Sequence, residues 1–141
     1  MRSILGAAID DEADVTIVDM EAGLEHLSRS GGTLAYADVL LAIMEPTRKS
    51  IITAARTMAL AAELGIPRTF GLGNKARLPE DREFYVDVCG EYGVPLAGVI
   101  PYDSGVVDAD RSGTSLEAGR GEPVREEIAK VLEFLDAVPV G

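Results

Sequence analysis

Short apolar runs recur along the chain at intervals that suit an alternation of strands and helices. Four of them are expected to be strands: residues 15–18, 39–44, 69–72 and 96–100. Apolar and polar residues do not alternate within these runs, so both faces of each strand should be covered, as in a parallel sheet.

Segments in which apolar residues recur with helical spacing lie before and between these runs. They cover residues 4–9, 51–62, 84–88 and 124–135. Thr47 is placed to cap the second of these helices and Gly65 to end it. Pro123 is placed to open the last one. The stretch 103–122 is rich in Gly, Ser and Asp, and we expect it to be the one long loop.

Strands and helices that alternate along a chain are typical of a layered α/β fold with right-handed crossovers. We therefore expect three layers, a mostly parallel sheet flanked by helices. A length of 141 residues suits one domain, which we expect to span residues 1–141. In open parallel sheets, ligands bind beyond the carboxyl ends of the strands. The polar residues expected along this edge are Asp19, Glu45, Asn74 and Asp103.

Composition and charge narrow the choice of function. Acidic residues outnumber basic ones by 24 to 13, and the net charge of −11 argues against a nucleic-acid partner, whose phosphates require a surplus of Lys and Arg. The apolar runs are too short to span a bilayer, and the first residues do not resemble a signal peptide. We therefore expect a cytoplasmic protein without a membrane partner.

The chain has one cysteine, Cys89, and one histidine, His26. These two residues alone cannot form a disulfide or a self-contained metal site, so we expect no metal bound directly by the protein. We interpret Cys89 as a small apolar residue on a helix. A lone histidine is more often a surface or packing residue than a ligand, and His26 is interpreted in that way.

One segment, VTIVDMEAGLEH at residues 15–26, allows a more specific interpretation. It resembles the second nucleotide motif of the MinD-like, deviant-Walker ATPases, in which a strand ends in Asp and Ala-Gly follows after two intervening residues. An aspartate at that place can hold the water shell of a magnesium ion, and the glycine lets the backbone approach the γ-phosphate. Within that superfamily the string looks most like the accessory ATPases that assist nickel insertion into carbon monoxide dehydrogenase.

Three later segments resemble the same family in the same order. Residues 45–50, EPTRKS, resemble its strand-to-helix turn, and Asn74-Lys75 resemble the pair whose Asn reads the adenine edge. Residues 100–103, IPYD, resemble the loop that closes over the base. The resemblance implies ATP or ADP with magnesium as the ligand. It implies catalytic roles for Asp19 and Gly23 and cofactor binding by Asn74, Lys75, Pro101 and Tyr102.

Each of these residues also has a plain structural interpretation. An aspartate such as Asp19 commonly ends a strand, and an asparagine such as Asn74 is a common turn residue. The residues from Glu21 to Gly23 would then form an ordinary turn.

The chain departs from the family pattern in two ways. It contains no glycine-rich phosphate loop of the form G-K-G-G-x-G-K-[ST], and it lacks the Cys-x-Cys pair of the nickel ATPases. In the family fold, the phosphate-loop strand lies between the strand that ends at Asp19 and the one that ends at Glu45. We therefore expect no ATP hydrolysis by this chain alone. Without that central strand, we expect the chain to be unstable alone, to form a homodimer by edge pairing, or to need a separate N-terminal half as partner.

The function expected from these features is that of a nucleotide-binding accessory protein, with carbon monoxide dehydrogenase as a possible client. The alternative is a non-catalytic interaction module that docks on a dehydrogenase or on a partner ATPase. A third role, positioning at a membrane, is disfavoured because residues 134–141 contain no Lys or Arg.

Overall fold

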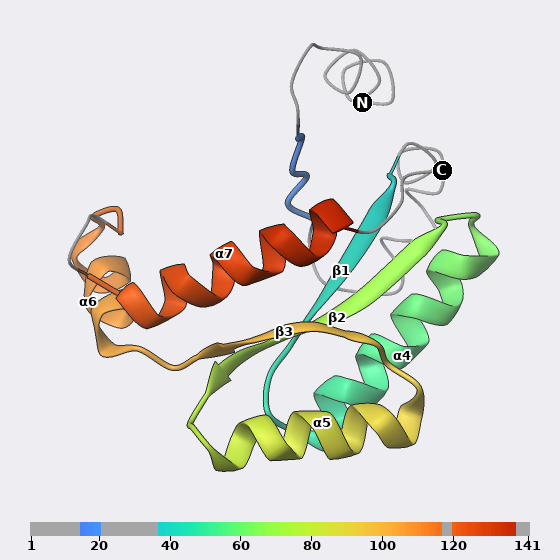
Figure 1. Ribbon diagram of the computed structural model, residues 1–141, viewed down its shortest axis with the longest axis horizontal. Coiled ribbons are helices and arrows are strands. Elements are labelled where there is room, and N and C mark those ends of the chain that lie inside the picture. Colours follow the sequence, from blue (N-terminus) through green and yellow to red (C-terminus); the bar gives the residue numbers. More distant parts are fainter. Residues whose placement is uncertain (1–14, 21–36, 117–119, 138–141) are drawn as a thin grey trace.

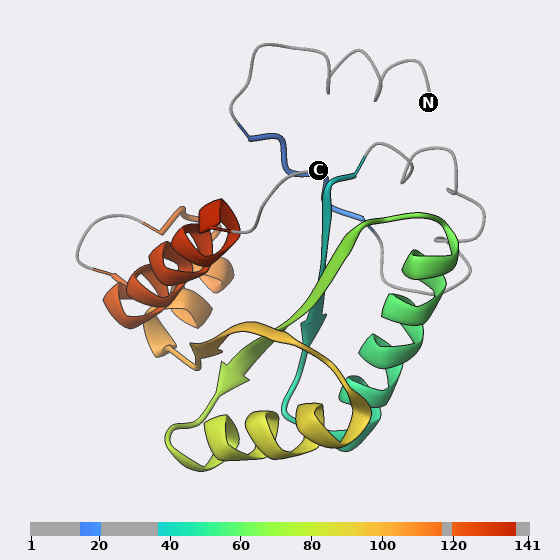
Figure 2. The same cartoon turned by 45° about the vertical axis from the view of Figure 1, so that its right-hand side comes forward.

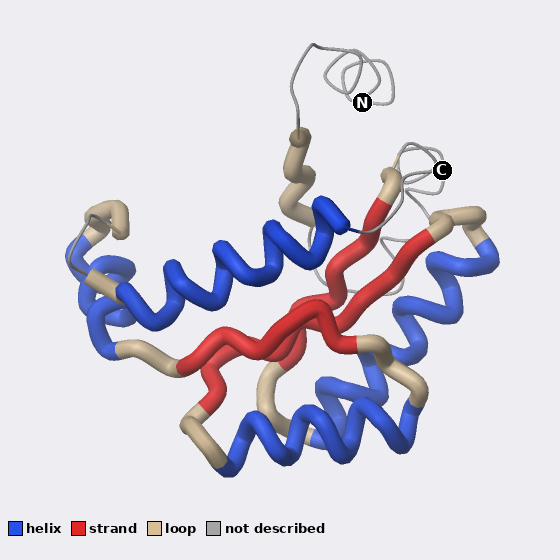
Figure 3. The backbone as a smooth tube through the Cα atoms, in the orientation of Figure 1, coloured by secondary structure: helices blue, strands red, loops and turns tan. Residues whose placement is uncertain are grey.

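The computed structural model describes residues 15–20, 37–116 and 120–137. Its elements are β1 (Val39–Met44), α4 (Arg48–Glu63), β2 (Arg68–Ala76), α5 (Glu80–Tyr92), β3 (Leu96–Pro101), α6 (Ser104–Ser112) and α7 (Glu122–Ala137). The three strands form a parallel sheet in the order β1-β2-β3 (Figure 1). The coloured tube in Figure 3 shows that each strand is followed by a helix.

Helices cover both faces of the sheet. The helices α4 and α5 lie on one face and α7 lies on the other, where it packs mainly on β3 (Figure 2). The predicted three-layer α/β fold is confirmed. The core between the sheet and the α4–α5 layer contains the fully buried side chains of Met44, Ile51, Tyr85 and Cys89. Cys89 is thus the buried apolar helix residue that the sequence predicted.

The helix boundaries follow the local signals in the sequence. The Thr47 hydroxyl accepts a hydrogen bond from the Ser50 N–H at 3.1 Å and caps α4, as predicted. Gly65 follows the end of that helix with φ +86°, and Gly93 ends α5 with φ +69°. Both glycines adopt the left-handed conformation that other residues rarely take.

Two expectations about elements are wrong. Residues 15–18 are not a strand: residues 15–20 have no regular secondary structure, and the Val15 and Ile17 side chains are largely exposed. A strand needs a neighbour to hydrogen-bond its backbone, and in the described sheet, which has the order β1-β2-β3, residues 15–18 pair with none of the three strands. The expected loop 103–122 contains the helix α6, because the Asp103 side chain caps its first turn.

Some predicted features lie outside the described residues. These are the short helix over residues 4–9, the residues Glu21, Ala22 and Gly23, and His26. Among the helices that are described, none combines the length and the apolar character needed to cross a bilayer.

Candidate functional site

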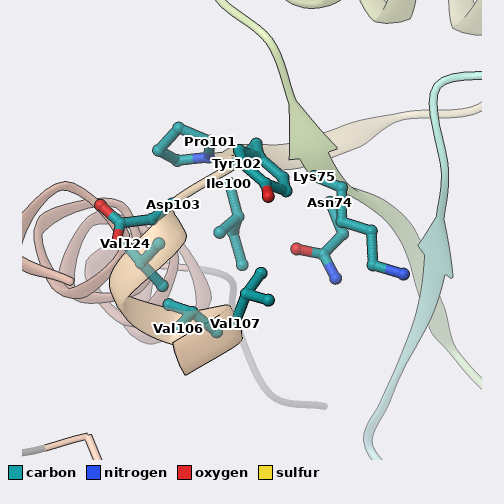
Figure 4. A pocket seen from close by; sticks show the side chains of 9 residues that line it. All are labelled: Asn74, Lys75, Ile100, Pro101, Tyr102, Asp103, Val106, Val107 and Val124. Atoms are coloured by element: carbon teal, nitrogen blue, oxygen red, sulfur yellow. The ribbon is translucent and has the colours of Figure 1, made fainter. Parts of the chain in front are cut away.

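The carboxyl ends of β2 and β3 meet at a small pocket of about 110 Å³. Figure 4 shows its lining, which comes from both strands and from the two helices beyond them. The lining residues are Asn74, Lys75, Ile100, Pro101, Tyr102, Asp103, Val106, Val107 and Val124. The four cofactor-binding residues expected from the sequence therefore lie together around one pocket.

A bulge at the end of β2 determines where Asn74 and Lys75 point. Gly73 pairs with Val99 and Ala76 pairs with Pro101, so β2 contains one residue more than β3 between these pairs. Lys75 has φ +53°, a conformation that is uncommon for a residue with a side chain. The two residues thus lie within the last part of β2, and not after the strand as the sequence suggested.

The bulge directs the two side chains to different places. In Figure 4 the Asn74 amide extends toward Ile100 and Val107, whereas Lys75 extends toward β1. The Lys75 ammonium lies 3.0 Å from a carboxylate oxygen of Glu45, which follows β1. Both partners are about 60% exposed, so this ion pair contributes at most about 1 kcal/mol to stability. Its main effect is that the Lys75 ammonium group already has a carboxylate partner.

The walls of the pocket are apolar. Ile100 comes from β3, Val106 and Val107 come from α6, and Val124 comes from α7. A planar, largely apolar group would therefore be enclosed on several sides, with the Asn74 amide as a hydrogen-bonding group.

Tyr102 forms the exposed wall of the pocket. Its N–H donates a hydrogen bond to the Ala76 carbonyl at 2.7 Å, which holds its backbone against β2. The guanidinium carbon of Arg77 lies 5.8 Å from the centre of the Tyr102 ring, within the range of a cation–π contact. Tyr102 is 49% exposed, so part of it remains accessible to a ligand or a partner.

A second depression is also lined in part by Tyr102. Its volume is about 450 Å³, and its lining consists of Glu45, Pro46, Thr47, Lys75, Arg77, Asp81 and Tyr102. Asp81 accepts a hydrogen bond from the Arg77 N–H at 2.7 Å, so this carboxylate is already engaged. Lys75 and Tyr102 line both hollows.

The structure separates the other predicted residues from this edge. Asp19 is exposed, and the next residue, Met20, packs beside Ala61 and Ile66 near the end of α4. The expectation that Asp19 lies at the carboxyl edge is therefore wrong for this structure, because residues 15–18 do not enter the sheet. Asp103 lies at the edge, but its carboxylate accepts a hydrogen bond from the Gly105 N–H at 2.7 Å and caps α6.

The pocket suits the base of an adenine nucleotide and its phosphates to different degrees. The apolar walls and the Asn74 amide suit a planar base. Among the described residues that line the pocket, the one lysine is Lys75, and its ammonium group is paired with Glu45. Among the described residues, no cluster of three or more His, Cys, Asp or Glu side chains could bind a metal ion. The described residues thus suit the base better than the phosphates.

Sequence reasoning missed Tyr85, a fully buried residue of α5. Its hydroxyl lies 2.8 Å from the Asn74 carbonyl and 2.9 Å from the Met44 carbonyl, and it accepts a hydrogen bond from the Asn74 N–H at 3.2 Å. Burial raises the pKa of this phenol to about 12. The sequence contained no signal for this role, because the contact joins a helix side chain to the backbone of a strand.

Known proteins resemble this chain in sequence. No family model matches it. An uncharacterized ATP-binding protein of Methanocaldococcus jannaschii is 35% identical over 136 residues, which are 96% of this chain and 51% of that protein. The carbon monoxide dehydrogenase accessory protein CooC of Rhodospirillum rubrum is 36% identical over 115 residues, 82% of this chain and 42% of that protein. The chain thus spans about half the length of the curated relatives it matches.

Solved structures show the same fold. The cell division protein MinD of Aquifex aeolicus matches with a TM-score of 0.63 and 18% identity, over 78% of this chain and 49% of that one. The MinC:MinD complex of Aquifex aeolicus matches with a TM-score of 0.65 and 17% identity, over 86% of this chain and 49% of that one. The chain is therefore similar in sequence to CooC and to an ATP-binding relative, and it has the fold of MinD, which confirms the resemblance expected from its motifs.

Proposed function

We propose that this chain is a nucleotide-binding accessory protein of the CooC type, and that it holds the base of ATP or ADP in the pocket at the ends of β2 and β3. One observation carries the proposal: Asn74, Pro101 and Tyr102, which resemble the family's base-binding residues, line one apolar pocket although they are distant in sequence. The relatives' names support it, because one is ATP-binding and one is an accessory protein.

Each residue has a role in this proposal. The Asn74 amide reads the adenine edge with one donor and one acceptor. Pro101 and Tyr102 cover the base, and Lys75 is available to the nucleotide only if its pair with Glu45 opens. Magnesium would arrive with the phosphates. Asp19 would hold its water shell, with Gly23 close to the γ-phosphate, only in an assembly in which residues 15–18 enter the sheet.

Hydrolysis requires more than these residues. A lysine from a phosphate loop normally neutralises the group that is transferred, and the sequence contains no such loop. We therefore propose that residues 1–141 form a single partial domain, which does not hydrolyse ATP alone. The partner that completes it is either a second copy of the chain or a separate N-terminal half.

Two observations support a partner at β1. It is an edge strand among the described residues, and one of its apolar side chains is largely exposed. Ile43 on this strand is 59% exposed. Because Met44 is buried against the α4–α5 layer, Ile43 points to the opposite face of the sheet. The proposed client of the assembly is carbon monoxide dehydrogenase, which the name of the relative CooC mentions.

The alternative function is a non-catalytic module that docks on a dehydrogenase or a partner ATPase. Exposed apolar side chains favour it: Ile43, Ile128 and Leu132 are each more than 40% exposed. This alternative requires no nucleotide, so a binding measurement separates the two.

Calorimetric titration of the full chain with Mg-ATP tests the proposal. We expect micromolar binding, and we expect Asn74→Ala to weaken it by roughly tenfold, since about 1–2 kcal/mol of hydrogen bonding is lost. Glu133→Ala, an exposed change on α7 away from the pocket, serves as the control and should bind as the unaltered chain does. Absence of binding by the unaltered chain would overturn the proposal in favour of the docking module.

A further inference from the structure

The hydroxyl of Tyr85 connects the carboxyl ends of β1 and β2. It reaches them from α5, on the face of the sheet that this helix covers, and contacts the carbonyl of Met44 and both backbone polar groups of Asn74. The side chain is fully buried. A hydroxyl has one proton and two lone pairs, so it can donate to one carbonyl at a time, or share its proton between both, while it accepts from the Asn74 N–H.

The hydroxyl replaces a neighbouring strand at this point. Pairing between β1 and β2 ends with Met44 and Gly73, and the chain after Met44 turns away into α4. Asn74 is the next residue of β2, so its N–H and C=O have no strand partner on β1 and require another one. The Tyr85 hydroxyl supplies it for both groups.

Gly73 makes room for this arrangement. A Cβ atom at Gly73 would lie 2.8 Å from the Tyr85 ring, closer than carbon atoms can approach. Only glycine lets the ring lie flat against β2 here and places the hydroxyl beside the bulge. The pair formed by Gly73 and Tyr85 therefore fixes the peptide of the residue whose side chain enters the pocket.

We propose that Tyr85 is a positioning residue for base selection: by holding the Asn74 peptide, it sets the preference of the pocket for adenine. This inference rests on the proposed function. An asparagine side chain is short, so the place of its amide depends directly on its own backbone. Reading adenine requires the amide oxygen and nitrogen to meet two atoms of the base edge together. A shift of the peptide therefore affects discrimination between bases more than it affects general affinity.

The first test needs no nucleotide. In the full chain, Tyr85→Phe removes the acceptor of the Asn74 N–H but keeps the ring, and we expect hydrogen exchange of this amide to accelerate roughly tenfold. Tyr92→Phe removes a hydroxyl from the same helix, where it lies 3.5 Å from Arg48, and should leave the Asn74 amide unchanged. Unchanged exchange at Asn74 in folded Tyr85→Phe would overturn the inference.

The second test measures base selection with ATP and with ITP, which carries hypoxanthine instead of adenine. We expect Tyr85→Phe to reduce the ratio of the two dissociation constants roughly fivefold. In the background of Asn74→Ala it should have no further effect on this ratio, because Tyr85 acts through Asn74. An equal loss in both backgrounds would show a general structural role and overturn the inference.

A second variant covers the case in which Tyr85→Phe does not fold. Gly73→Ala keeps the hydroxyl but displaces the ring, and we expect it to lower the same ratio. If the unaltered chain binds ATP and ITP but Gly73→Ala leaves the ratio unchanged, the inference is wrong while the proposed function stands. If the unaltered chain binds neither nucleotide, the proposed function is wrong. Hydrogen exchange at the Asn74 amide then tests by itself whether Tyr85 holds this peptide, and Gly73→Ala is the variant used if Tyr85→Phe does not fold.

Discussion

At the scale of single residues, the candidate site depends on side chains whose surroundings the sequence does not reveal. Asn74, Lys75, Pro101 and Tyr102 could be named in advance because they resemble a family motif. Tyr85 could not, because its importance comes from a contact across the core with a backbone segment 11 residues earlier. Neither the spacing of α5 nor the composition distinguishes it from an ordinary core aromatic.

Tyr85 should also make the free energy of unfolding depend on pH. Burial raises the pKa of its phenol from 10 in the unfolded chain to about 12 in the folded one. Folding therefore favours the neutral phenol. The stability that this preference contributes to the folded state is fully present below pH 10 and is lost as the pH rises toward 12. We expect the free energy of unfolding to fall more steeply over this interval for the unaltered chain than for Tyr85→Phe. Equal slopes in denaturant titrations would contradict this, and Tyr92→Phe is the matched control.

At the scale of elements, the pattern of apolar residues predicted most of what forms. The strands β1, β2 and β3 and the helices α4, α5 and α7 were expected near their observed places. The two errors have different causes. Residues 15–18 have the composition of a strand, but a strand also requires a partner, which is not a local property. The helix α6 was missed because residues 103–122 are rich in Gly, Ser and Asp, a composition that is typical of a loop.

The packing of α7 on β3 provides a prediction at this scale. A Cβ atom at Gly98 would lie 2.8 Å from a methyl group of Val131, so Gly98→Ala should force the helix away from the sheet. We expect it to lower the free energy of unfolding by about 1–3 kcal/mol. Removing the methyl group with Val131→Ala should recover part of this loss, so that the double variant is more stable than the sum of the single changes implies. Strict additivity in denaturant melts would contradict the proposed contact.

At the scale of the whole molecule, the three layers could be predicted, but the surroundings of β1 could not. Sequence patterns give the order of the strands only through analogy, and the apolar pattern of β1 does not say what lies beside it. Among the described residues β1 is an edge strand, and its Ile43 is 59% exposed on the side opposite Met44. An apolar edge of this kind favours association with another chain.

We therefore expect the purified chain to associate as its concentration rises. A lysine in place of Ile43 should shift the equilibrium toward the monomer by placing a charge at the edge, whereas Val86→Lys, at a residue of α5 that is 57% exposed, should not. Sedimentation velocity over a range of concentrations measures both. A stable monomer at every concentration would contradict this prediction and the proposed homodimer.

The position of Tyr102 between two hollows has a thermodynamic consequence. Its ring and the Lys75 side chain are shared by the apolar pocket and by the charged depression beside it. Any molecule that moves either side chain in one compartment changes the shape of the other. Linkage makes such an influence mutual: if an occupant of the depression strengthens binding in the pocket, the occupant of the pocket strengthens binding in the depression by the same factor. The binding of two ligands would then be coupled through the ring of Tyr102, which lines both hollows.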